Sequence, residues 1–140
     1  MMKDVFKYEN REKLYDFLYS FGFIKVKDEF TPETFGNFII ILSKLDNYYL
    51  IYSNDRSRMT ISISSKLEPN ESIPLSLVKQ YINSENEVEI DDNDEIRINK
   101  LNSFLKENLS KIDFMFSKEN YFDTKRKIIE MRKKDFDDKL

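Results

Sequence analysis

The sequence contains no histidine, no cysteine and no tryptophan, and alanine is absent as well. Without cysteine the chain has no disulfide framework, no thiolate nucleophile and no cysteine-ligated zinc or iron–sulfur site. Without histidine it has no imidazole base and no Ser-His-Asp relay. These absences exclude several large classes of enzyme, and we expect no metal and no cofactor.

Glycine is also scarce, because only Gly22 and Gly36 occur. Two isolated glycines form neither the phosphate-binding P-loop nor the dinucleotide-binding glycine pattern. Long hydrophobic runs are missing too: no segment approaches the roughly 18 apolar residues of a membrane span, and the charged N-terminus lacks the apolar stretch of a signal peptide. We therefore expect a cytoplasmic protein with no membrane segment.

What the chain does contain suits one globular domain covering residues 1–140. Charged residues make up 35% of the sequence and hydrophobic residues 40%, which is polar for a globular protein. However, 12 Phe and 8 Tyr supply large units of buried surface. We expect a core built from a few bulky side chains.

The first third of the chain predicts a helix followed by a strand. In NREKLYDFLYSFGF the apolar residues follow helical spacing, and Gly22 is the expected C-terminal cap. These apolar positions are Leu14, Phe17, Leu18 and Phe21. The next segment, FIKVKDEF, alternates apolar and charged residues, which predicts a strand at the edge of a sheet.

Three further strands are predicted in FGNFIIILSK, NYYLIYSN and RMTISISS, and their short connections force an antiparallel meander. The run 38–42 is apolar at every position, which favours an interior strand. In the last strand Met59, Ile61 and Ile63 alternate with Thr60, Ser62 and Ser64, which predicts one face in water.

The rest of the chain is predicted to be helical apart from an acidic linker at 84–95. The segment SIPLSLVKQYIN predicts a short helix with Ser72 as N-cap and Pro74 in its first turn. The helical segment 96–140 contains INKLNSFLKENLSKIDFMF and a last helix capped by Asp123 or Thr124. This order predicts an α+β fold: an N-terminal helix, an antiparallel four-stranded meander, and C-terminal helices packed on one sheet face.

The first candidate site is the predicted hairpin tip with Asp55, Arg56 and Arg58. The two arginines lie two positions apart and would point the same way from a strand end, as a fork for phosphate or carboxylate. Alternatively, these are ordinary turn residues whose charges keep a hairpin end soluble. We favour the turn interpretation.

The second candidate is the acidic stretch, which has seven carboxylates and no basic residue. An EF-hand loop counted from Asp91 would need glycine at Ile96 and a carboxylate at Asn102, so a calcium loop is excluded. The stretch is either a solvated linker or a surface that attracts a basic partner. Its carboxylates are Glu85, Glu87, Glu89, Asp91, Asp92, Asp94 and Glu95.

The third candidate is a tyrosine cluster on one strand, formed by Tyr48, Tyr49 and Tyr52. The alternation of a strand places Tyr48 and Tyr52 on one face and Tyr49 on the other, and both faces cannot easily be buried. The tyrosines either pack within a half-buried sheet or serve as aromatic anchors for a partner.

A fourth candidate is the basic segment KRKIIEMRKK at 125–134. It would attract nucleic acid, but acidic residues are interspersed, so we interpret it as a salt-bridged solvent face. No carboxylate is isolated among apolar residues that would raise its pKa, and we find no catalytic constellation.

The order of these segments resembles small bacterial proteins similar to the immunity proteins of contact-dependent or polymorphic toxin systems. The matching pieces are Phe35-Gly36-Asn37 entering a strand, Asp55-Arg56 at a hairpin, and the segment 120–124 opening the last helix. Ser57 departs from the group, which often has glycine there. The resemblance implies stoichiometric binding of a toxin without catalysis, and it assigns no site residues.

We therefore expect a non-catalytic protein-binding module, an immunity-type inhibitor that sequesters a partner toxin. In this hypothesis the acidic stretch speeds encounter with a basic toxin, and Tyr48 and Tyr52 are desolvated anchors. The alternative is a nucleic-acid-binding regulator that uses Arg56, Arg58 and the basic C-terminal helix. A carboxylate-dependent hydrolase is a third possibility, and the sequence sets no oligomeric state.

Overall fold

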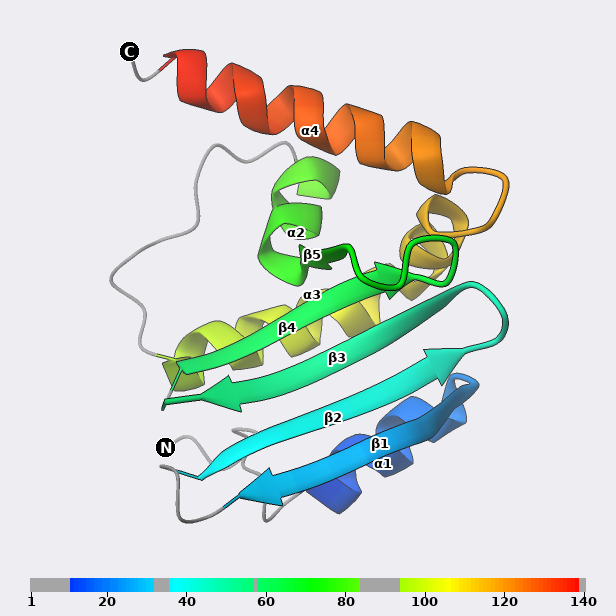
Figure 1. The fold of residues 1–140 in the computed structure, drawn as a ribbon, viewed down its shortest axis with the longest axis vertical. Helices are drawn as coiled ribbons and strands as arrows, with labels where there is room; N and C mark the ends of the chain where they lie inside the picture. The colour runs from blue at the N-terminus through cyan, green and yellow to red at the C-terminus, as the bar shows by residue number, and fades with distance from the viewer. Residues whose placement is uncertain (1–10, 32–35, 57, 84–93, 139–140) are drawn as a thin grey trace.

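The computed structural model describes residues 11–31, 36–56, 58–83 and 94–138, and it has the predicted α+β architecture (Figure 1). One five-stranded sheet has the order β1-β2-β3-β4-β5, with every neighbouring pair antiparallel. Its strands are β1 (Phe23–Thr31), β2 (Asn37–Lys44), β3 (Tyr48–Asp55), β4 (Arg58–Ser65) and β5 (Ser72–Pro74). The helices are α1 (Arg11–Ser20), α2 (Leu75–Asn83), α3 (Asp94–Met115) and α4 (Tyr121–Asp138).

The meander predicted from the sequence is confirmed, but the sheet has a fifth strand. Ser72 and Pro74 pair with β4, and α2 begins only at Leu75. The prediction that Ser72 caps this helix is therefore wrong. Proline has no backbone N–H to donate to a ladder, so it is tolerated on an edge strand such as β5.

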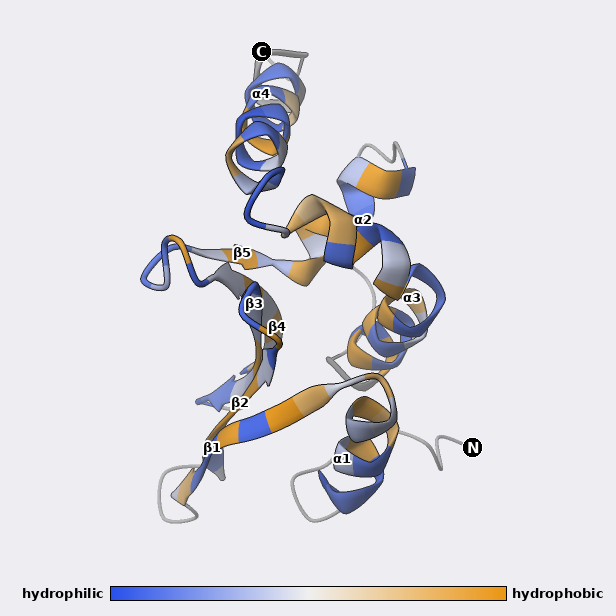
Figure 2. Ribbon diagram, turned by 90° about the vertical axis from the view of Figure 1, so that its right-hand side faces the viewer, coloured by the Kyte–Doolittle hydropathy of each residue, from blue (hydrophilic) through white to orange (hydrophobic). Residues whose placement is uncertain are grey.

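Alternation along β2, β3 and β4 gives the sheet a covered face and an open face. The covered side chains are buried beneath α1 and α3, which lie on the same side of the sheet (Figure 2). They are Phe38, Ile40, Leu42, Tyr48, Leu50, Tyr52, Ile61 and Ile63. The strand at 38–42 is interior as expected, but its other face is only half-buried.

Both helices that cover the sheet present the apolar residues expected from their spacing, with one change in α1. The predicted apolar side of α3 is buried, and its residues are Leu101, Phe104, Leu105, Leu109 and Ile112, followed by Phe116 just after the helix. In α1, Leu14 and Leu18 are buried together with Tyr15, whereas Phe21 is exposed in the turn after the helix. Gly22 follows with φ 90°, a left-handed conformation that ends helices well.

The last helix differs most from the expectation that the C-terminal helices pack on the sheet. Helix α4 packs on α2 and stands away from the sheet (Figure 1). It begins at Tyr121, so Asp123 and Thr124 lie inside its first turn and neither is the cap. Within the described part of the chain, no helix is long and apolar enough to cross a membrane.

The Glu68 carboxylate, in the loop between β4 and β5, binds side chains in the first turns of α4. The Tyr121 hydroxyl and the Lys125 ammonium both donate to Glu68 Oε1, at 2.8 and 2.7 Å. The hydrogen bond from Lys125, with a second from Tyr121, lowers the pKa of Glu68 from its ordinary 4.5. Burial, followed by the hydrogen bond to Glu68, raises the pKa of the Tyr121 hydroxyl. The hydroxyl therefore remains a donor.

We predict that acid weakens this attachment. Because the folded-state pKa of Glu68 is lowered, its contribution to stability is complete above the ordinary pKa of 4.5 and is lost as pH falls through the folded-state value. Urea unfolding followed from neutral into acidic pH should show a smaller loss of stability in Glu68→Gln than in the unchanged chain. Glu12→Gln, at an exposed position on α1, is the control. Equal acid dependence in all three proteins would contradict the assignment.

Candidate functional site

The open face of the sheet carries a patch of apolar side chains that no described helix covers. Its members are Ile24, Ile39, Ile41, Tyr49 and Ile51, and we call them the open-face patch. The register places Ile41 directly beside Ile51, and Ser43 between Ile24 and Tyr49. In Figure 2, α1, α2 and α3 lie on one side of the strands, and no described helix lies on the opposite side, which is the open face. β-Branched residues favour strands on either face. Burial on the covered face requires apolar residues only at every second position, so the core does not need the isoleucines of the open face.

The patch is most exposed at the edge strand β1. Ile24 is 68% exposed, and Val26 is 58% exposed at a bulge between Lys25 and Lys27. Toward β4 the open face becomes hydroxylic, since Ser53 and Thr60 share a 2.7 Å hydrogen bond between their side-chain oxygens. The open face therefore has an apolar half centred on β2 and β3, with polar residues toward β4 and charged residues along the outer part of β1.

The hairpin tip lies at one end of this face. Asp55 pairs with Arg58 in the register, and Arg56 occupies the turn with φ 54°. The Arg56 backbone N–H donates to Asn37 Oδ1 at 2.8 Å, which joins the tip to the start of β2. A turn at this position is confirmed, and whether the tip contacts a partner stays a prediction. The expectation that both arginines project from one strand is wrong, because Arg56 lies in the turn.

Tyr48 and Tyr52 belong to the covered face, with 0% and 1% of their surface exposed. The Tyr48 hydroxyl donates to Asp113 Oδ1 at 2.7 Å, and the Tyr52 hydroxyl donates to Asn102 Oδ1 at 2.6 Å. Burial raises the pKa of both hydroxyls, and for Tyr48 the hydrogen bond to Asp113 adds to the rise. The prediction that these two tyrosines are partner anchors is wrong, because a partner cannot reach them.

Tyr49 is the member of the tyrosine cluster that remains on the open face. Its ring is half-buried, and the Lys66 ammonium lies 5.0 Å from the ring centroid. The same ammonium donates to the Leu45 carbonyl at 2.7 Å, so the lysine is held over the ring. A ring held in this way offers a rigid surface with little conformational entropy left to lose.

A buried lysine that the sequence analysis did not single out lies beneath the sheet. Lys44 is 8% exposed, forms an ion pair with Asp113 at 3.5 Å and donates to the Phe21 carbonyl. Its ammonium is also 4.9 Å from the centroid of the Phe23 ring. The alternation of FIIILSK could have revealed it, since Lys44 shares the parity of the buried residues. Because Asp113 also accepts from Tyr48, this cluster joins β2, β3 and α3.

The acidic stretch contributes little to the described structure. Glu85, Glu87, Glu89, Asp91 and Asp92 lie outside the described residues. Asp94 and Glu95 open helix α3, and only their backbone is described. The role of this stretch in attracting a partner stays a prediction.

The basic segment of α4 is largely neutralised at its start. Lys125 pairs with Glu68, whereas Arg126 and Lys127 both pair with Asp123, at 2.6 and 2.9 Å. Arg126 also pairs with Glu130 at 3.1 Å. The interpretation of a salt-bridged solvent face is confirmed for this half of the helix.

Comparison with known proteins does not assign the chain to a family. No family model matches it, and neither the curated proteins nor the solved structures gave a match. Among the side chains that the structure describes, no three of the Asp and Glu carboxylates gather closely enough to hold a metal ion. The open-face patch with its neighbouring hairpin is therefore the candidate site that the geometry defines best.

We predict that Tyr48→Phe destabilises the fold by about 1–3 kcal/mol, because Asp113 loses a buried donor. The adjacent Tyr49→Phe removes the same atom from the open face and should change the free energy of unfolding by less than about 0.5 kcal/mol. Urea unfolding of both variants measures the difference. Equal effects at the two positions would show that the hydrogen bond from Tyr48 to Asp113 on α3 does not matter.

Proposed function

We propose that this protein is a non-catalytic binding module whose partner docks on the open-face patch, and that it acts as an immunity-type inhibitor that sequesters a toxin. The observation that carries the proposal is the uncovered apolar half of the sheet, centred on Ile41 and Ile51. Contiguous apolar side chains that remain accessible on a sheet face are typical of protein interaction sites.

The patch has the composition of an interface core. Burying apolar surface against a partner favours binding, and side chains already held in a sheet lose less conformational entropy when a partner covers them. Tyr49 adds an aromatic ring, the residue type most enriched among strong contributors to binding. The partner's contacts would therefore concentrate around Ile41, Ile51 and Tyr49.

Charged residues border the patch and would orient the partner. Lys27 and Glu29 lie on β1 and form an ion pair at 3.6 Å, while Asp55 and Arg58 occupy opposite register positions at the hairpin. Charges at an interface rim mainly affect the association rate and the choice of partner. The acidic stretch at 84–95 and the net charge of −3 fit a basic partner.

The toxin in this proposal comes from the resemblance of the sequence to immunity proteins. Such an inhibitor needs affinity for the toxin and correct positioning on it, but it needs no reacting group. A candidate site that consists of a surface patch agrees with this requirement. Its competitor is the nucleic-acid-binding regulator. That alternative has less support, because Lys125, Arg126 and Lys127 of the basic helix are already held in ion pairs.

We predict that Ile41→Lys weakens binding to the partner at least about ten-fold, because a charge enters the desolvated centre of the interface. The partner is first isolated by covalent capture from the producing cell and purified, and its affinity is then measured by calorimetry. Ile129→Lys is the matched control, since Ile129 is 55% exposed on α4, away from the sheet.

The same variants test the inhibitor role. Cells that produce the partner toxin should survive with the unchanged chain or Ile129→Lys, and die with Ile41→Lys. Circular dichroism and thermal unfolding establish that both variants fold. If Ile41→Lys binds as tightly as the unchanged chain, the open-face patch is not the interface. If the captured partner is harmless to cells, the immunity role fails while the binding role survives.

A further inference from the structure

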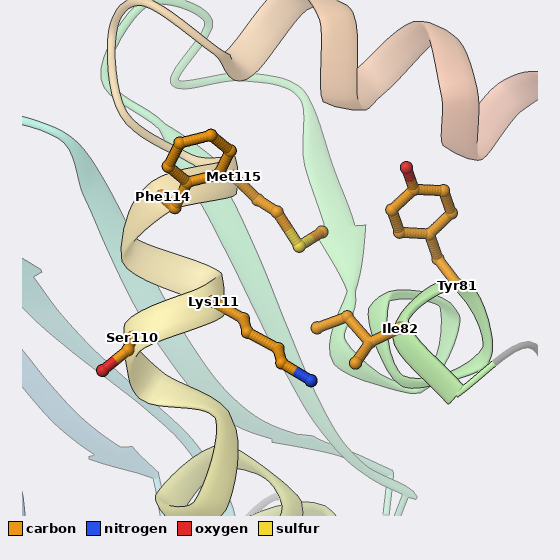
Figure 3. A pocket seen from close by; sticks show the side chains of 6 residues that line it. All are labelled: Tyr81, Ile82, Ser110, Lys111, Phe114 and Met115. Atoms are coloured by element: carbon orange, nitrogen blue, oxygen red, sulfur yellow. The ribbon is translucent and has the colours of Figure 1, made fainter.

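A second surface lies on the helical side of the molecule, in a groove between α2 and the end of α3 (Figure 3). The groove has a volume of about 610 Å³. It is lined by Tyr81, Ile82, Ser110, Lys111, Phe114 and Met115. In Figure 3 the side chains of Ile82, Lys111 and Met115 point into the space between the two helices. This volume is typical of a site that accepts one or a few side chains of a ligand.

The groove depends on a break in α3. Asn108 has non-helical backbone angles, φ −122° and ψ 17°, and its side-chain amide donates to the Phe104 carbonyl at 2.9 Å. The last turns of α3 after this kink carry Lys111, Phe114 and Met115. Phe114 is 67% exposed there, the most exposed aromatic side chain of the residues that the structure describes. An exposed phenyl ring beside an apolar groove is costly in water and favourable in an interface.

The charge along the groove is mainly positive. A second hollow of about 360 Å³ lies between residues of the same two helices, and its lining includes Lys79, Lys100 and Glu107. With Lys111, the two hollows together present three lysines and one carboxylate. Within the described residues neither Lys79 nor Lys111 forms an ion pair. The groove thus combines an apolar pocket with Lys79 and Lys111, which no described carboxylate pairs, whereas Lys100 does have a partner.

We propose that this groove binds an acidic segment of a partner protein, which inserts one apolar side chain between Ile82, Phe114 and Met115 and places carboxylates near Lys79 and Lys111. Charge complementarity selects the acidic flanks. The aliphatic lining favours a peptide over nucleic acid, because Ile82 and Met115 offer nothing to a phosphate backbone. The surface is separate from the open-face patch, which lies on the other side of the sheet (Figure 2).

The test uses the full chain and a short capped peptide in which a central Leu-Phe pair is flanked on both sides by Glu and Asp. Amide chemical shifts should move at 81–82 and 110–115, and labelled-peptide anisotropy gives the affinity. We expect Phe114→Ser to weaken binding about ten-fold and Lys111→Gln about three-fold. Lys13→Gln, at an exposed position on α1, makes the same charge change and should leave the affinity unchanged.

The outcomes separate the possibilities. Weaker binding of a peptide with Ser in place of Leu-Phe, and weaker binding at higher salt, support the proposal. Equal affinities of Lys111→Gln and Lys13→Gln, or no shifts at the groove, overturn it. Binding of a single-stranded oligonucleotide as tightly as the peptide also overturns it, in favour of nucleic acid. Ile41→Lys should bind the peptide normally, so failure of the open-face proposal leaves this test intact.

Discussion

The arrangement of this protein depends on two hydrogen bonds between the centre of the sheet and α3. Tyr48 and Tyr52 project from the same face of β3, and their hydroxyls donate to Asp113 and Asn102 on the helix. Because both hydroxyls are buried, leaving either one unpaired would cost free energy, so the helix is held on this face and in this register. The opposite face of β3, with Tyr49 and Ile51, receives no such cover.

The other polar contacts support the same one-sided packing. Asp28 of β1 accepts from Tyr15 at 2.6 Å and from Arg11 at 3.0 Å, which holds α1 against β1. Glu68 fastens α4 at the end of the molecule, where the helix rests on α2. The helices therefore gather on one side of the sheet or beyond its end. The apolar residues that the strands carry on the other side remain available, and this availability motivates the binding function proposed above.

Much of this fold could be predicted from local sequence patterns. Alternation identified the strands, and helical spacing identified the buried side of α3, because both patterns reflect which side chains lose contact with water. The sequence alone could not tell which face of β3 the helices cover, since both faces carry tyrosine and isoleucine or leucine. Tertiary contacts decide this choice, through Asn102 and Asp113 on α3. The groove beside Phe114 was also missed, because it depends on the kink at Asn108 and on how α2 lies against α3.

The central claim, that one face of the sheet is covered and the other is open, can be measured within a single residue type. Isoleucine methyl groups alternate between the two faces, so a soluble paramagnetic agent should broaden the methyl resonances of one set in the free protein and spare those of the other. The open-face set comprises Ile39, Ile41 and Ile51, which are partly exposed, and the protected set comprises Ile40, Ile61 and Ile63, which are buried. We predict strong broadening of the first set alone. Equal protection of both sets would contradict the account, because it would mean that the open face is already covered.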